Sequence, residues 1–242
     1  MQKKIIAIAS LILLMGCDKH DPVLPGVRKP IFTNTELKIE NKTIFDLPEI
    51  AFTHDNTKCP YTQDSQNVIW NGNRKIFSGF ATNNSVASTQ KPICDGRYLY
   101  AGLTTGEVIK INQTNRQIMW IADVYSPSNM TGGASIVDIV APIVPYNRAV
   151  YAGGMGDAFC KINATSGVKQ WCKNISTAMP FIIAGDYVFV VSADNYLYAI
   201  GTKQGDIFWR TEIEKQSVPT YKSGIITVGK MQINASDGKI IK

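Results

Sequence analysis

The alternation of apolar and polar residues along this 242-residue chain predicts short β-strands from about residue 91 onward. Residues 98–101 alternate after the turn pair Asp95-Gly96, and residues 107–111 alternate again. Residues 188–191 are apolar on both faces, as expected of a strand buried between two sheets. Short strands at this spacing, separated by turn residues, are typical of an all-β sandwich, barrel or propeller.

A repeated phrase favours the propeller among these folds. Residues 110–120 align with residues 161–171, and both stretches begin with Lys-Ile-Asn and end with Trp. The phrase returns at residues 199–209 and 232–241, and a proline marks the start of each unit: Pro92, Pro142, Pro180 and Pro219. A period of roughly 38–50 residues is that of a propeller blade. We therefore predict four-stranded antiparallel blades, about four of them, over residues 91–124, 139–176, 178–214 and 217–242.

The tryptophans of the phrase are predicted to join neighbouring blades. One four-stranded sheet cannot bury both of its faces alone, so the blades must stack. We assign this docking role to Trp120, Trp171 and Trp209, and also to Trp70, which lies in what looks like an isolated outer strand. Propellers usually have about four to eight blades. The chain is therefore either a short propeller or part of a longer one.

The N-terminus has the pattern of a secreted lipoprotein. Two lysines are followed by an apolar run over residues 5–15, which is too short to span a membrane and has the length of a signal-peptide core. The run ends in Leu14-Met15-Gly16-Cys17, which resembles the bacterial lipobox. We predict a signal peptide over residues 1–16, acylation of Cys17, an irregular tether and lead-in over residues 17–66, and propeller repeats over residues 67–242.

Charge and cysteine content narrow the function classes. Loss of Lys3 and Lys4 with the signal peptide leaves 23 basic and 19 acidic residues, a net charge near +4, and the basic residues form no run. This argues against a nucleic-acid-binding surface.

Cys160 and Cys172 flank the turn at residues 163–167 symmetrically, so we predict a disulfide between them in an oxidising compartment. Two unpaired thiols are the alternative. The state of Cys59 and Cys94 stays open.

The repeated phrase resembles the PQQ-like β-propeller repeat family. Within it, the lipobox followed by residues 21–26 looks like the start of the BamB-like outer-membrane protein assembly lipoproteins, and residues 184–195 are similar to a blade of that group. The spacing of Trp70, Gly79 and Pro92 fits the closing outer strand and first full blade of the family. The resemblance implies a scaffold without enzymatic activity or cofactor, anchored in the outer membrane by lipid and facing the periplasm.

The same resemblance implies partners in the barrel-assembly machinery, in particular its barrel-inserting subunit. Two differences between this chain and the family limit which residue roles can be transferred to it. Family members are much longer than this chain. Their partner loop carries a Leu-x-Leu-Arg-like stretch that does not occur here, and the connection from Asp123 to Asp138 has a suitable length but a different sequence. We therefore assign no partner-binding residue. Asp18 after the lipobox cysteine suggests the inner membrane as an alternative location.

Two other functions remain open at this point. One is a quinoprotein-like oxidoreductase or a fragment of one, which would need PQQ, a calcium shell and a catalytic Asp. The only histidines, His20 and His54, fall in the irregular lead-in. The pairs Asp194-Asn195 and Asp237-Gly238 fit hairpin turns better than a calcium loop. We predict no metal, no cofactor and no small-molecule substrate. The other is a truncated remnant of a longer propeller.

Overall fold

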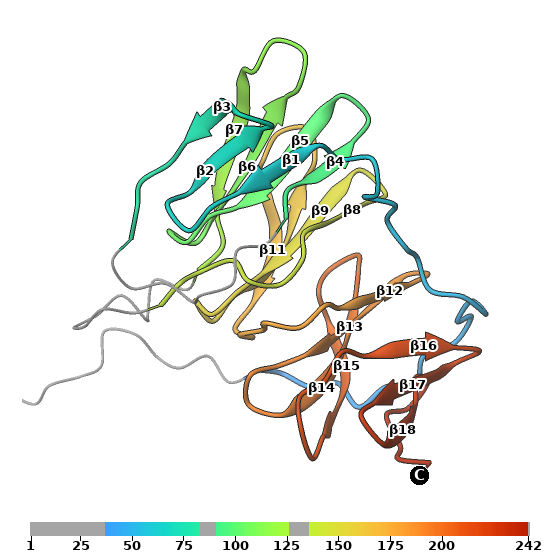
Figure 1. Ribbon diagram of the computed structural model, residues 1–242. Helices are drawn as coiled ribbons and strands as arrows, with labels where there is room; N and C mark the ends of the chain where they lie inside the picture. Colours follow the sequence, from blue (N-terminus) through green and yellow to red (C-terminus); the bar gives the residue numbers. More distant parts are fainter. Residues whose placement is uncertain (1–36, 83–90, 126–135, 242) are drawn as a thin grey trace, which may run out of the picture. The chain divides into compact units, whose positions relative to one another are not determined.

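The computed structural model describes residues 37–82, 91–125 and 136–241, all within the unit Glu36–Lys242. The regular elements of these residues are β-strands, and every strand pair is antiparallel (Figure 1). Within them, no helix has the length and apolar character needed to cross a membrane. The strands form five sheets, numbered here in chain order.

Sheet 1 consists of β1 (Tyr61–Gln63), β2 (Val68–Asn71) and β3 (Arg74–Ser78). Sheet 2 consists of β4 (Ile93–Asp95), β5 (Tyr98–Gly102), β6 (Glu107–Asn112) and β7 (Ile118–Asp123). Sheet 3 consists of β8 (Val144–Tyr146), β9 (Ala149–Gly153), β10 (Phe159–Asn163) and β11 (Lys169–Lys173). Sheet 4 consists of β12 (Ile182–Ala184), β13 (Tyr187–Val191), β14 (Tyr196–Gly201) and β15 (Ile207–Glu212). Sheet 5 consists of β16 (Thr220–Lys222), β17 (Ile225–Val228) and β18 (Met231–Asn234).

Sheet 1 corrects one expectation from the sequence. The run Val68–Trp70 is the middle of a three-stranded sheet and not an isolated outer strand, because β2 pairs with β1 on one side and β3 on the other. Neither partner strand of β2 has a clear pattern in the sequence. Residues 61–63 are too short to show alternation, and β3 begins with two charged residues, Arg74 and Lys75.

Sheets 2, 3 and 4 repeat one irregularity. In each, the pairing of the last two strands shifts by one residue, between Lys110 and Ile111, between Lys161 and Ile162, and between Ala199 and Ile200. Such a β-bulge bends the strand and increases its local twist. The bulge falls next to the tryptophan of the repeated phrase each time. The repeat in sequence is therefore a repeat in backbone geometry.

The core consists of four apolar layers, each shared by two consecutive sheets. Ile69 of sheet 1 packs with Leu99 and Ile109 of sheet 2. Corresponding clusters join sheets 2 and 3, sheets 3 and 4, and sheets 4 and 5. Phe189 of β13 and Ile233 of β18 are both fully buried in the last of these. Face-to-face burial of this kind explains why the middle strands carry apolar residues on both faces.

Each full sheet buries a tyrosine in a middle strand: Tyr100 in β5, Tyr151 in β9 and Tyr198 in β14. Burial raises the pKa of all three phenols above the ordinary value near 10. Their contribution to stability is complete below the unfolded-state pKa and is lost as the pH rises above about 10. Alkaline pH should therefore unfold this protein.

We expect the free energy of unfolding to fall by about 1.4 kcal/mol per pH unit above pH 10 for each of Tyr100 and Tyr151, whose pKa values are raised most. Urea titrations at several pH values between 9 and 11.5 measure that slope. Tyr100→Phe keeps the ring and removes one phenol, so its slope should be shallower by that amount. Equal slopes for Tyr100→Phe and the wild type would contradict the assignment.

Candidate functional site

The repeated tryptophans lie at the junctions between sheets. Trp120, Trp171 and Trp209 are buried. Each indole N–H donates to a backbone carbonyl in the turn of the next sheet, at Ala164, Thr202 and Ala235, each over 3.1 Å. One side chain thus supplies apolar area and a directional bond to its neighbour. These residues hold consecutive sheets together.

A glycine in each receiving turn makes room for the ring. A Cβ at Gly167, Gly205 or Gly238 would lie 2.7 Å from the ring of the docked tryptophan, and all three glycines have a positive φ of 73–75°. The equivalent turn position in sheet 2 is Arg116, with φ 60°. No tryptophan stands at the docking position of sheet 1, so a side chain fits there. The turn residue therefore depends on the neighbouring sheet.

Two lysines, the buried Lys110 and the half-buried Lys161, share the receiving carbonyls. Lys110 Nζ donates to the Ala164 carbonyl, and Lys161 Nζ donates to the Thr202 carbonyl over 2.8 Å. The Lys110 ammonium also lies 3.7 Å from the centre of the Tyr98 ring. Burial lowers the pKa of both lysines. The aligned lysines were visible in the sequence, but spacing alone did not show that they point inward.

Trp70 is arranged differently from the other three. It lies on β2, is half-buried, and donates its indole N–H to the Asp64 carboxylate of its own sheet over 3.0 Å. Phe77 of β3 holds the place that tryptophan has in the other sheets, because it pairs with Ile69 just before the bulge. The indole N–H of Trp70 thus stays within its own sheet, whereas Phe77 packs against the cluster that joins sheets 1 and 2.

The described cysteines form two disulfides. Cys160 and Cys172 pair directly across β10 and β11 and are bonded, with a Cα–Cα distance of 4.1 Å. Cys59 and Cys94 are also bonded, with a Cα–Cα distance of 5.3 Å, and join the lead-in to β4. Cys17 lies outside the described residues, so its acylation stays a prediction.

The lead-in segment, residues 37–59, runs along the first strands of the sheets. The Phe52 N–H donates to Ile183 of β12 over 2.7 Å, and its ring lies 4.7 Å from that of Tyr146 of β8. The Tyr221 hydroxyl of β16 donates to the carbonyl of Pro48. At the other end, the ring of His54 bonds to the carbonyl of Cys94 in β4 over 3.0 Å. Four sheets therefore share one connecting segment.

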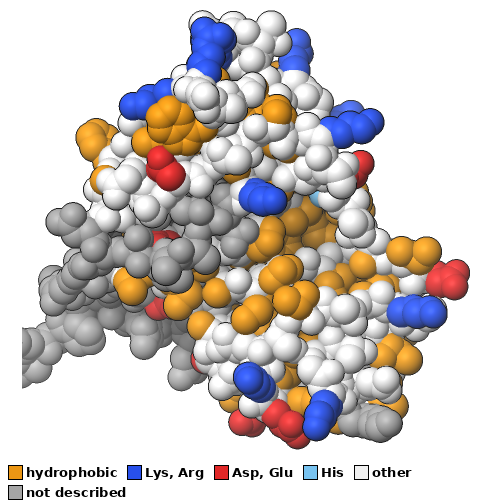
Figure 2. All heavy atoms as spheres, in the orientation of Figure 1, with side chains coloured by type: hydrophobic (Ala, Val, Ile, Leu, Met, Phe, Trp, Pro, Cys, Tyr) orange, Lys and Arg blue, Asp and Glu red, His pale blue; other side chains and the backbone are white. Residues whose placement is uncertain are grey.

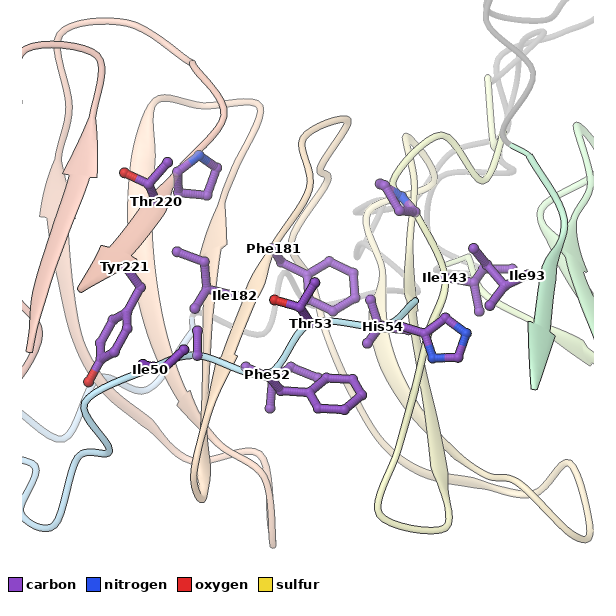
Figure 3. A pocket seen from close by; sticks show the side chains of 15 residues that line it. Ile50, Phe52, Thr53, His54, Ile93, Ile143, Phe181, Ile182, Thr220 and Tyr221 are labelled. Atoms are coloured by element: carbon purple, nitrogen blue, oxygen red, sulfur yellow. The ribbon is translucent and has the colours of Figure 1, made fainter. Parts of the chain in front are cut away.

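Beside this segment lies an apolar groove of about 380 Å³. Figure 3 shows the segment crossing from Tyr221 on sheet 5 to Ile93 on sheet 2, with Phe52 and Phe181 between them. The remaining walls come mainly from aliphatic side chains such as Ile143 and Ile182. Figure 2 shows hydrophobic side chains gathered in a hollow of the face in view.

The other candidates from the sequence have structural roles or fall outside the described residues. His20 lies outside the described residues. Asp194 accepts from Ser192 within its turn, and Asp237 pairs with Lys239 over 2.9 Å. Gly154 is required by packing, since a Cβ there would lie 2.0 Å from the Asp138 carbonyl. In the described part of the chain, no three His, Cys, Asp or Glu side chains gather as a metal site would require.

Comparison with known proteins identifies the family. The model of the family described as "Outer membrane protein assembly factor BamB" matches residues 30–211. The chain belongs to this family. A curated BamB from Alkalilimnicola ehrlichii is 19% identical over 128 residues, which are 53% of this chain and 33% of that protein. The crystal structure of BamB from Moraxella catarrhalis matches with a TM-score of 0.65 and 18% identity, over 79% of this chain and 62% of that one.

These comparisons confirm the predicted fold class, an all-β propeller with PQQ-like repeats. Sheets 2, 3 and 4 are the predicted four-stranded antiparallel blades, whereas sheets 1 and 5 have three strands. They also confirm the BamB-like resemblance. The chain covers a third of the length of the curated relative and less than two thirds of the solved one.

Proposed function

We propose that this protein is an accessory scaffold of outer-membrane β-barrel protein assembly, without enzymatic activity. The observation that carries the proposal is the family match over residues 30–211, which spans 182 of the 242 residues. The polar groups at the sheet junctions are consistent with it, because Lys110, Lys161 and the tryptophan N–H groups all donate to backbone carbonyls there. Their hydrogen bonds serve packing between blades.

The proposal includes a lipid anchor at Cys17, with the protein facing the periplasm. We expect a clickable palmitate analogue to label the wild-type protein in bacteria and to leave Cys17→Ala unlabelled. This prediction rests on the apolar run that precedes Leu14-Met15-Gly16-Cys17. Equal labelling of the two proteins would contradict the lipobox assignment. Separation of inner and outer membranes then distinguishes outer-membrane anchoring from the inner-membrane alternative suggested by Asp18.

Co-purification tests the assembly role. The full-length protein with a C-terminal affinity tag should retain the barrel-inserting subunit after mild detergent extraction, and deletion of its gene should lower the amount of folded outer-membrane barrels. A tagged periplasmic lipoprotein of unrelated fold is the matched control. Absence of the barrel-inserting subunit from the eluate, together with unchanged barrel levels, would refute the proposal.

A further inference from the structure

The outer edge of sheet 2 differs from the equivalent edges of the other four-stranded sheets. Its last strand, β7, exposes Ile118, Met119 and Ile121 by 49%, 46% and 48%. The last strand of a sheet also presents a row of N–H and C=O groups without partners in that sheet. Asp123 is the only charged residue of β7. An edge with exposed apolar residues and one charge lacks the usual protection against pairing with another strand.

The corresponding strands of sheets 3 and 4 have such protection. β11 carries Lys169 and Lys173, and its Cys172 is tied to β10 by a disulfide. β15 carries Arg210 and Glu212. These strands have the same length or nearly the same length as β7 and hold the same docking tryptophan. The contrast is therefore specific to the outward residues of β7.

Sheet 4 provides an example of a chain segment added beside its last strand. The N–H groups of Glu40 and Lys42 donate to the carbonyls of Ile207 and Phe208 over 2.8 and 2.9 Å. Ile39 forms a parallel bridge with Ile207. The lead-in thus adds extended backbone to the start of β15. Within the described residues, no comparable backbone bond is made to the outer edge of β7.

Charge indicates which strand would fit beside β7. Glu107 of β6 lies directly across from Asp123, and like charges in this position are destabilising. Burial and these two carboxylates raise the pKa of the nearby Tyr125. No salt bridge to Glu107 or Asp123 occurs within the described part of the chain. A basic side chain from outside would relieve the repulsion.

The bulge fixes the order of the recognised side chains. Ile118, Ile121 and Asp123 pair with Ile111, Ile109 and Glu107, which alternate along β6. The three β7 residues therefore lie on the same face of the sheet. A strand added beside them meets two apolar residues and then a carboxylate pair.

We propose that β7 binds an extended segment of a partner protein by strand addition. The segment carries two apolar residues at alternate positions, with Lys or Arg at the next alternate position, opposite Asp123. Main-chain hydrogen bonds provide the affinity, and the alternate side chains provide the specificity. The proposal deepens the scaffold function above and rests on it only for the partner's biological role, because strand addition itself is a property of the isolated protein.

Two fluorescein-labelled peptides test the proposal with the purified residue 18–242 chain. Both alternate Thr and Val over ten residues, and they end in Arg in one case and Glu in the other. By fluorescence anisotropy, we expect the Arg peptide to bind the wild-type protein. The Ile121→Arg variant should bind the same peptide with a Kd at least about tenfold higher. Gln170→Arg, an exposed position on β11, is the control and should bind like the wild type. Circular dichroism and a thermal midpoint verify that each variant is folded.

Charge reversal supplies a second, independent readout. The Asp123→Lys variant should bind the Arg peptide more weakly and the Glu peptide more tightly than the wild type does, so that the charge preference is reversed. Binding unaffected by Ile121→Arg, absence of a charge preference, or no binding of either peptide would each overturn the proposal.

Sedimentation equilibrium tests whether a second copy of the protein occupies this edge instead. A dimer of the wild type that Ile121→Arg dissociates would mean that a second copy takes this edge, and the proposal would be wrong. None of these outcomes depends on retention of the barrel-inserting subunit.

Discussion

Replacing Trp171 with Ala is expected to lower the free energy of unfolding by about 3–5 kcal/mol, as for other buried large aromatics. Trp171 is 9% exposed and packs against Tyr151 and Phe159, with ring centres 6.1 Å away in both cases. The substitution also leaves the Thr202 carbonyl with one donor fewer. The loss falls at the junction of sheets 3 and 4, so it weakens both.

Equilibrium urea unfolding, followed by far-ultraviolet circular dichroism, measures this loss. Gln170→Ala is the matched control, because Gln170 is the exposed neighbour of Trp171 on the same strand. The control should change stability by no more than about 0.5 kcal/mol. A loss below about 1 kcal/mol for Trp171→Ala would mean that the residue does not dock the two sheets.

Removal of the Cys59–Cys94 disulfide is expected to be nearly as costly, at about 4 kcal/mol. The two cysteines are 35 residues apart, and the chain-entropy relation predicts a larger effect for a longer closed loop. The same relation gives about 3 kcal/mol for Cys160 and Cys172, which are 12 residues apart. The first bond has a second role, since it fixes the end of the lead-in against β4.

The double variants Cys59→Ser/Cys94→Ser and Cys160→Ser/Cys172→Ser, unfolded in urea beside the oxidised wild type, give both values. Each serves as a control for the other, because each keeps one bond. Peptide mapping without reduction on periplasmic material establishes the pairing directly. Recovery of Cys160 and Cys172 in separate peptides with free thiols would refute that bond and the hairpin register with it.

Local rules explain why the blades could be predicted from the sequence. In sheets 2, 3 and 4 the last hairpin turn and the tryptophan that follows lie within a dozen residues. The alternation, the turn and the docking residue therefore all appear in one phrase. Direct opposition of Cys160 and Cys172 follows from the same hairpin register.

Contacts between distant parts of the chain could not be predicted in this way, because they produce no recognisable pattern in the sequence. The bond between Cys59 and Cys94, and the path of the lead-in along β4, β8, β12 and β16, depend on pairings that carry no periodic pattern. Trp70 was misplaced for a related reason, since a tryptophan outside the repeated phrase does not reveal which strand of a sheet it occupies. The exposed edge of β7 became evident only when the outward residues of three strands could be compared.

The path of the lead-in also determines when this protein can finish folding. The Ile44 carbonyl accepts a hydrogen bond from the Ser236 hydroxyl, 192 residues later in the chain. The Pro48 carbonyl accepts one from the Tyr221 hydroxyl, 173 residues later. Export from the N-terminus, as the proposed signal peptide requires, delivers Ile44 across the membrane 192 residues before its partner. Sheets 1 to 4 can form in order as they emerge, whereas the segment made before them waits for sheet 5. During that interval Ile44 and its neighbours are exposed to chaperones and proteases, so the first part of the chain is among the last to be protected.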